Sequence, residues 1–88
     1  MLQHTYQIVN KLGLHARASA LVVKTAAPFT SEVRLGLAET EVNGKSIMGV
    51  MTLAATKGST VRLIVDGPDE EIAMETIGKL IEDGFGEI

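Results

Sequence analysis

The sequence predicts an α+β fold in which helices pack on one face of a mostly antiparallel sheet. Alternating apolar and polar residues mark strands, and apolar residues at helical spacing mark helices. Glycine and proline separate these segments, and the order reads β-α-β-β-α-β-α. Because 88 residues can build only one core, and no repeat or linker is visible, we expect a single domain over residues 1–88.

The N-terminal half predicts a strand, a helix and a hairpin. Residues 2–9 alternate as a half-buried strand does. A loop containing Gly13 then leads into an alanine-rich helix over residues 16–27, which ends at Pro28. Residues 31–37 alternate again, and a short partner strand follows at about residues 40–42.

The C-terminal half predicts two helices on either side of one strand. Ser46 is placed to cap a short helix over residues 47–53. Thr60–Asp66 is the clearest strand, with Val61, Leu63 and Val65 facing the core and Ile64 as the exception. Three acidic residues, 69–71, open the last helix beside the positive end of its dipole, and Gly84 is a natural stop.

Composition excludes several classes of protein. Without cysteine the chain can form neither disulfides nor a thiolate zinc site, which suits a reducing cytoplasm. The net charge of −3 and only three aromatic residues argue against nucleic-acid binding. The N-terminus does not resemble a signal peptide, and the apolar runs are too short to span a bilayer. We therefore expect a cytoplasmic protein that binds neither membrane nor nucleic acid.

His15 is the leading candidate for chemistry because it precedes the predicted helix directly. The first N–H groups of a helix lack intrahelical partners and can bind an anion, and Arg17 adds a positive charge. A neutral imidazole nitrogen is a nucleophile near neutral pH, so His15 could accept and release a phosphoryl group. Taken alone, the same residues also fit a surface or capping histidine.

The other polar residues are weaker candidates for a functional site. His4 lies in the first strand with no histidine or cysteine partner, so we expect no metal site. Ser19 and Thr25 have no residue placed to activate them, and we interpret both as residues on the helix surface. The glycines show no phosphate-loop spacing, so no nucleotide pocket or other cofactor is expected.

Two segments resemble one known family. Residues 10–17 read NKLGLHAR and resemble the active-site loop of the HPr family, the histidine-containing phosphocarriers of the bacterial phosphoenolpyruvate-dependent sugar phosphotransferase system. Residues 45–51 read KSIMGVM and resemble the regulatory-serine segment of that family. The resemblance covers essentially the whole chain, because the order and length of the elements also match.

The resemblance implies a function and a fold. His15 would be phosphorylated by enzyme I, which draws on phosphoenolpyruvate, and would pass the phosphoryl group to enzyme IIA components. Arg17 would stabilise the phosphate. The protein would be a carrier rather than an enzyme and would act as a monomer. The implied fold is an open-faced β-sandwich, with a four-stranded antiparallel sheet covered on one face by three helices.

The second segment implies regulation and docking. Ser46 resembles the serine phosphorylated by HPr kinase/phosphorylase, although helix capping alone also explains a serine there. Ile47, Met48 and Met51 recur at helical spacing, which alone also fits a buried core face. Where they are exposed, they would form an apolar patch that serves as the partner interface. We expect Met48 and Met51 to be partly exposed, because so short a helix cannot bury every side.

One position departs from the usual sequence of the family. Ala18 stands where the family usually has proline, so the start of the helix is expected to be less rigid.

Three alternative functions remain. Residues 83–85 faintly resemble the nitrogen-related branch of the same system, which has identical chemistry and a regulatory output. A pure binding module and an acylphosphatase-like hydrolase are the remaining alternatives, although the glycine-rich loop of the latter is missing.

Overall fold

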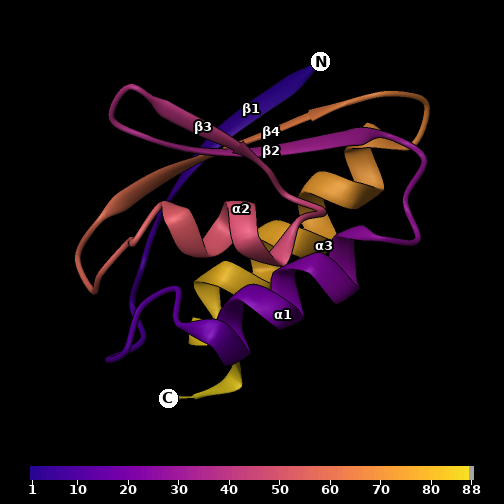
Figure 1. Cartoon of the computed structure of the whole chain (residues 1–88). Helices are drawn as coiled ribbons and strands as arrows, with labels where there is room; N and C mark the ends of the chain where they lie inside the picture. The colour runs from indigo at the N-terminus through magenta and orange to yellow at the C-terminus, as the bar shows by residue number, and fades with distance from the viewer. Residues whose placement is uncertain (88) are drawn as a thin grey trace.

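The computed structural model describes residues 1–87 and confirms the predicted fold class (Figure 1). An antiparallel sheet of four strands is covered on one face by three α-helices. The elements run in the order β1 (Leu2–Gln7), α1 (Ala16–Ala26), β2 (Glu32–Leu37), β3 (Thr40–Asn43), α2 (Ile47–Thr52), β4 (Thr60–Asp66), α3 (Glu70–Glu82) and a short 3-10 helix, η1 (Gly84–Gly86).

The sheet has the strand order β1-β4-β2-β3, so the last strand of the chain lies between the first two. In one row across it, Leu63 of β4 pairs with Leu35 of β2 and with His4 of β1, and Leu35 pairs with Val42 of β3. The two central residues of this row are buried, whereas His4 is exposed on the edge strand. The core therefore lies under the middle of the sheet.

Alternation along the central strands fills this core. Val61, Leu63 and Val65 of β4 are fully buried against the helices, as the sequence predicts. Val22 of α1 and Ile77 of α3 meet them from the opposite layer and are also fully buried. Burying one such side chain contributes about 1.5–3 kcal/mol, so this layer contact is the main source of stability.

The predicted ends of the elements are correct to within two residues. β1 ends at Gln7 instead of residue 9, because Ile8 leaves the sheet ladder and pairs with the loop before β4. Its N–H donates to the Ser59 carbonyl at 2.8 Å, and its carbonyl accepts from the Gly58 N–H at 2.8 Å. Helices α1 and α2 each stop one residue earlier than predicted, with residues 27 and 53 as C-caps.

Placing Ser19 on the helix surface is wrong. Ser19 is fully buried, and its Oγ donates to the Leu14 carbonyl at 3.1 Å. The hydroxyl thus ties the first turn of α1 to the loop before it. Because α1 has a buried face that includes Ala18 and Val22, a small serine at this position can occupy the interior once its donor is satisfied.

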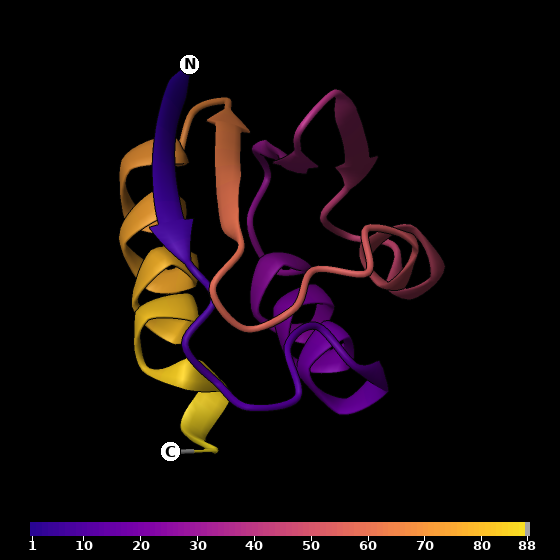
Figure 2. The same cartoon turned by 90° about the vertical axis from the view of Figure 1, so that its left-hand side faces the viewer.

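The site loop and the end of α3 meet at one end of the molecule. Figure 2 shows residues 8–15 passing beneath the sheet and the C-terminal end of α3 descending to the same side. This arrangement brings residue 87 next to residues 10–15. No helix within residues 1–87 has both the length and the apolar sequence needed to cross a membrane.

Candidate functional site

His15 occupies the N-cap position of α1, where the sequence predicts the start of the helix. Its backbone is extended, with φ −73° and ψ 180°, and its carbonyl accepts from the Ser19 N–H at 2.9 Å. The imidazole makes no capping hydrogen bond, and 27% of the side chain is exposed. The ring is therefore free of the helix backbone and accessible to another molecule.

The loop before His15 is fixed by its backbone. Gly13 adopts a left-handed φ of 64°, and a Cβ there would collide with the Ala55 carbonyl oxygen. Leu14 is buried and its N–H donates to that same carbonyl at 2.9 Å. Glycine is needed at residue 13 because only a residue without a side chain can pass so close in this conformation. The loop then emerges from the core with His15 at the surface.

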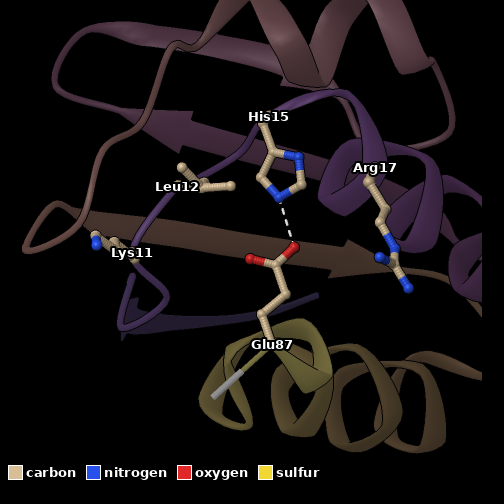
Figure 3. A pocket seen from close by; sticks show the side chains of 5 residues that line it. All are labelled: Lys11, Leu12, His15, Arg17 and Glu87. Atoms are coloured by element: carbon tan, nitrogen blue, oxygen red, sulfur yellow. Dashed lines mark hydrogen bonds and ion pairs between the residues drawn. The ribbon is translucent and has the colours of Figure 1, made fainter.

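His15 and Arg17 line the same open cavity, as the sequence predicts. This cavity has a volume of about 510 Å³, and its other lining residues are Lys11, Leu12 and Glu87 (Figure 3). Arg17 lies in the first turn of α1, where backbone N–H groups have no acceptor one turn earlier. Two cationic side chains and the start of a helix thus lie at the same open cavity as one partly exposed imidazole, an arrangement suited to an anion bound at the ring.

Glu87 is a site residue that sequence reasoning missed. Its Oε2 lies 2.5 Å from His15 Nε2, and its Oε1 accepts from Asn10 Nδ2 at 2.9 Å. Asn10 is fully buried, and its Nδ2 also donates to the Gly13 carbonyl at 2.9 Å. Because His15 and Glu87 are 72 residues apart, no local pattern in the sequence indicates their contact.

The surroundings of Glu87 favour its ionised form. The Asn10 amide is the largest cause, and the hydrogen bond to His15, the electrostatic effect of that ring and the charge of Arg17 add to it. Together they hold the pKa of Glu87 below its ordinary value, against the opposing effect of desolvation. At neutral pH a carboxylate therefore lies against one edge of the imidazole.

The second predicted segment lies on α2, outside this cavity. Ser46 caps α2 as predicted, and its Oγ accepts from the Gly49 N–H at 3.1 Å. Ile47, Met48 and Met51 have exposed fractions of 44%, 78% and 40%, so the expected exposure of both methionines is confirmed. Because α2 packs against α1, the exposed residues belong to the helical layer that also carries His15.

Comparisons with known proteins agree on one family. The family model described as the PTS HPr component phosphorylation site matches residues 2–83. A phosphocarrier protein HPr from Cupriavidus necator is 54% identical over 99% of this chain and 98% of that relative. The crystal structure of HPr from Thermoanaerobacter tengcongensis has a TM-score of 0.95 at 45% identity, covering 100% of this chain and 99% of that one. An HPr dimer from the same organism has a TM-score of 0.79 at 46% identity, covering 99% and 100%.

Proposed function

The chain belongs to the HPr family of phosphocarrier proteins of the phosphotransferase system, and on that premise we propose that His15 is the residue that carries the phosphoryl group. One observation carries the proposal: His15 is an accessible imidazole at the N-cap of a helix, in a cavity that Arg17 also lines. His4, the other histidine, lies on an edge strand without such surroundings.

The chemistry follows from these surroundings. A neutral ring nitrogen of His15 attacks the phosphorus of the donor, and the bond between phosphorus and the donor's leaving atom breaks. The backbone N–H groups at the start of α1 and the guanidinium of Arg17 then stabilise the negative charge of the bound phosphoryl group. Because the cavity is open, a second protein can approach and take the group away.

The experiment that tests this proposal is phosphorylation in vitro. We expect the wild-type chain, incubated with phosphoenolpyruvate, Mg²⁺ and enzyme I, to gain the mass of one acid-labile HPO₃ group. His15→Ala should gain none, whereas His4→Ala, a matched change at the other histidine, should gain as much as the wild type. An acid-labile phosphate on His15→Ala would refute the assignment.

Enzyme I is the proposed donor, and enzyme IIA components of the sugar branch are the proposed acceptors. The likeness of residues 45–51 to the sugar-branch protein supports this choice, whereas the nitrogen-related branch is the alternative. The phosphorylated chain should transfer its group to a sugar-specific IIA faster than to a nitrogen-type IIA. A faster transfer to the nitrogen-type IIA would assign the chain to the alternative branch.

We propose that Ile47, Met48 and Met51, here called the α2 patch, form the surface that docks enzyme I. Their exposure on one short helix supports this role, because methionine adapts its shape to different partners. Met48→Lys should weaken the affinity for enzyme I at least about tenfold without changing the urea midpoint. Ile72→Lys is the control, because Ile72 is 59% exposed in the first turn of α3 and belongs neither to the α2 patch nor to the lining of the His15 cavity.

Ser46 is proposed as a regulatory phosphorylation site for HPr kinase/phosphorylase. A phosphate there would add about −1.5 to −2 charges next to the α2 patch. On the resemblance to the HPr family, we further propose that the chain acts in the cytoplasm as a monomer. Light scattering on the purified protein tests the monomer.

A further inference from the structure

Leu12 is a large apolar side chain that the fold leaves in solvent at the His15 cavity. Its exposed fraction is 68%, and Figure 3 shows its side chain and the His15 imidazole at the same cavity. A single exposed apolar side chain is common on protein surfaces, and Ile72, at 59%, is an example. The position of Leu12, and not its exposure alone, therefore has to support a role.

The chain around Leu12 is held firmly. The Gly13 N–H donates to the Asn10 carbonyl at 3.3 Å, and the Asn10 Nδ2 donates to the Gly13 carbonyl at 2.9 Å. Residues 10–13 thus form a closed turn, and Asn10 and Leu14 are buried on either side of its tip. Because Leu12 is presented on a fixed turn, ordering this loop costs little free energy when another protein binds.

A protein that exchanges a phosphoryl group with His15 has to cover Leu12 as well. The two residues are three positions apart in the sequence, so their Cα atoms are separated by at most about 11 Å. A standard interface covers about 800 Å² of each partner, which corresponds to a circle of about 16 Å radius. An interface of that size centred on His15 therefore includes Leu12.

We propose that Leu12 is a docking residue shared by the donor and the acceptor of the phosphoryl group, and that both proteins present an apolar surface to it. This proposal rests on the proposed function of His15. The partner surface has to be apolar, because a polar group pressed against Leu12 would lose its hydrogen bonds to water without replacement. The α2 patch does not line the cavity, so Leu12 and the α2 patch are separate contacts.

Titration of the unphosphorylated chain with enzyme I, without phosphoenolpyruvate, measures this contact. Leu12→Ser should weaken the affinity about fivefold to thirtyfold, because the apolar surface of a side chain that is 68% exposed no longer leaves water on docking. Leu12→Met keeps an apolar side chain of similar volume and should stay within about twofold of the wild type. An affinity of Leu12→Ser equal to that of the wild type would overturn the proposal.

Two controls separate docking from other effects. Ile72→Ser makes the same kind of change at an exposed residue outside the cavity, so it should leave the affinity for enzyme I unchanged. The urea midpoint of Leu12→Ser should equal that of the wild type, since the side chain is mostly exposed and the turn is held by other groups. A weaker affinity that comes with a lowered midpoint would assign the loss to the turn and overturn the docking role.

Steady-state transfer tests whether the contact is shared. In Leu12→Ser the KM of enzyme I for the chain should rise with little change in kcat, because a docking contact stabilises the bound complex and the transition state equally. The KM of a sugar-specific IIA for the phosphorylated chain should rise by a similar factor. A rise for only one of the two proteins would contradict the shared role. If the wild type itself takes up no phosphoryl group, the proposed function fails, and the titration with enzyme I still reports on Leu12 independently.

Discussion

At the scale of single residues, Arg17 is the cation whose position in the first turn of α1 suits it to a phosphoryl group on His15. Arg17→Ala should slow phosphorylation by enzyme I about tenfold to hundredfold, because one charged donor for the phosphate is lost. Arg17→Lys should restore part of the rate, since lysine keeps the charge but not the planar set of donors.

The control for Arg17 is Lys24→Ala, which removes the same charge from an exposed position in the last turn of the same helix. Initial rates at equal protein concentration decide between the two. An equal loss in both variants would mean that Arg17 acts only through the net charge of the chain.

How well single residues can be predicted depends on how local their signals are. His15 and Arg17 are recognisable because their candidate role depends on the start of one helix and on a spacing of two residues. Glu87 is not, because its contact with His15 depends on the tertiary fold. Asn10 lies within the recognised segment, yet the hydrogen bonds of its buried amide follow only from the folded loop.

At the scale of elements, Ser46 has one structural role in α2 and one proposed regulatory role. Its Oγ caps the helix at the Gly49 N–H, and its proposed phosphorylation would add charge beside the α2 patch. Ser46→Asp should slow phosphorylation of His15 by enzyme I, because it brings a negative charge to that surface. Ser46→Asn caps a helix equally well without the charge, so it should retain the wild-type rate.

Urea unfolding separates capping from charge. Ser46→Ala should lower the free energy of unfolding by about 1 kcal/mol through loss of the cap, whereas Ser46→Asp and Ser46→Asn should change it little. If Ser46→Asn slows the reaction as much as Ser46→Asp, the effect comes from the hydroxyl itself, and the regulatory proposal is wrong.

Helices and strands were predictable wherever the spacing of apolar residues in the sequence matched the spacing of buried residues in the structure. The strand Thr60–Asp66 is correct to the residue, because one face of it is consistently apolar. The predicted helix ends were less exact. The C-cap residues of α1 and α2 have helical φ and ψ angles, so the sequence does not distinguish them from the last residues of the helix. The helix η1 was not predicted, although Gly84 does end α3 with a left-handed φ of 63°.

At the scale of the whole molecule, Asp69 joins two parts of the fold that are distant in sequence. Its carboxylate accepts from the Thr30 N–H at 2.8 Å, from the Ser31 N–H at 2.9 Å and from the Ser31 hydroxyl. The Ser31 hydroxyl, followed by the Thr30 N–H, holds the pKa of Asp69 below its ordinary value. The loop between α1 and β2 is thereby fastened to the start of α3.

This contact predicts how stability depends on pH. A lowered pKa in the folded state means that Asp69 contributes stability above the ordinary value of 3.8, and that this contribution disappears as the pH falls through the folded value. The free energy of unfolding should therefore decrease below about pH 4 in the wild type and decrease less in Asp69→Asn. Urea titrations at a series of pH values measure this difference.

Asp83→Asn is the control for Asp69, because the exposed Asp83 carboxylate makes no hydrogen bond or ion pair within residues 1–87. It should follow the wild-type pH profile. Glu70 will preserve some acid sensitivity in Asp69→Asn, since the Gly67 N–H and the N-terminal ammonium also lower its pKa. A profile of Asp69→Asn that coincides with the wild type would contradict the role of this contact.

The sharing of one carboxylate between Asn10 and His15 has a consequence for how such chains diverge. Asn10 is buried, and the partners of its amide donor are the Gly13 carbonyl and the Glu87 carboxylate. If a relative replaces the acid at position 87, the buried amide at position 10 loses one of its two acceptors. Asparagine is then no longer favoured at position 10 by that hydrogen bond. The two positions should therefore covary among relatives, although they lie at opposite ends of the gene.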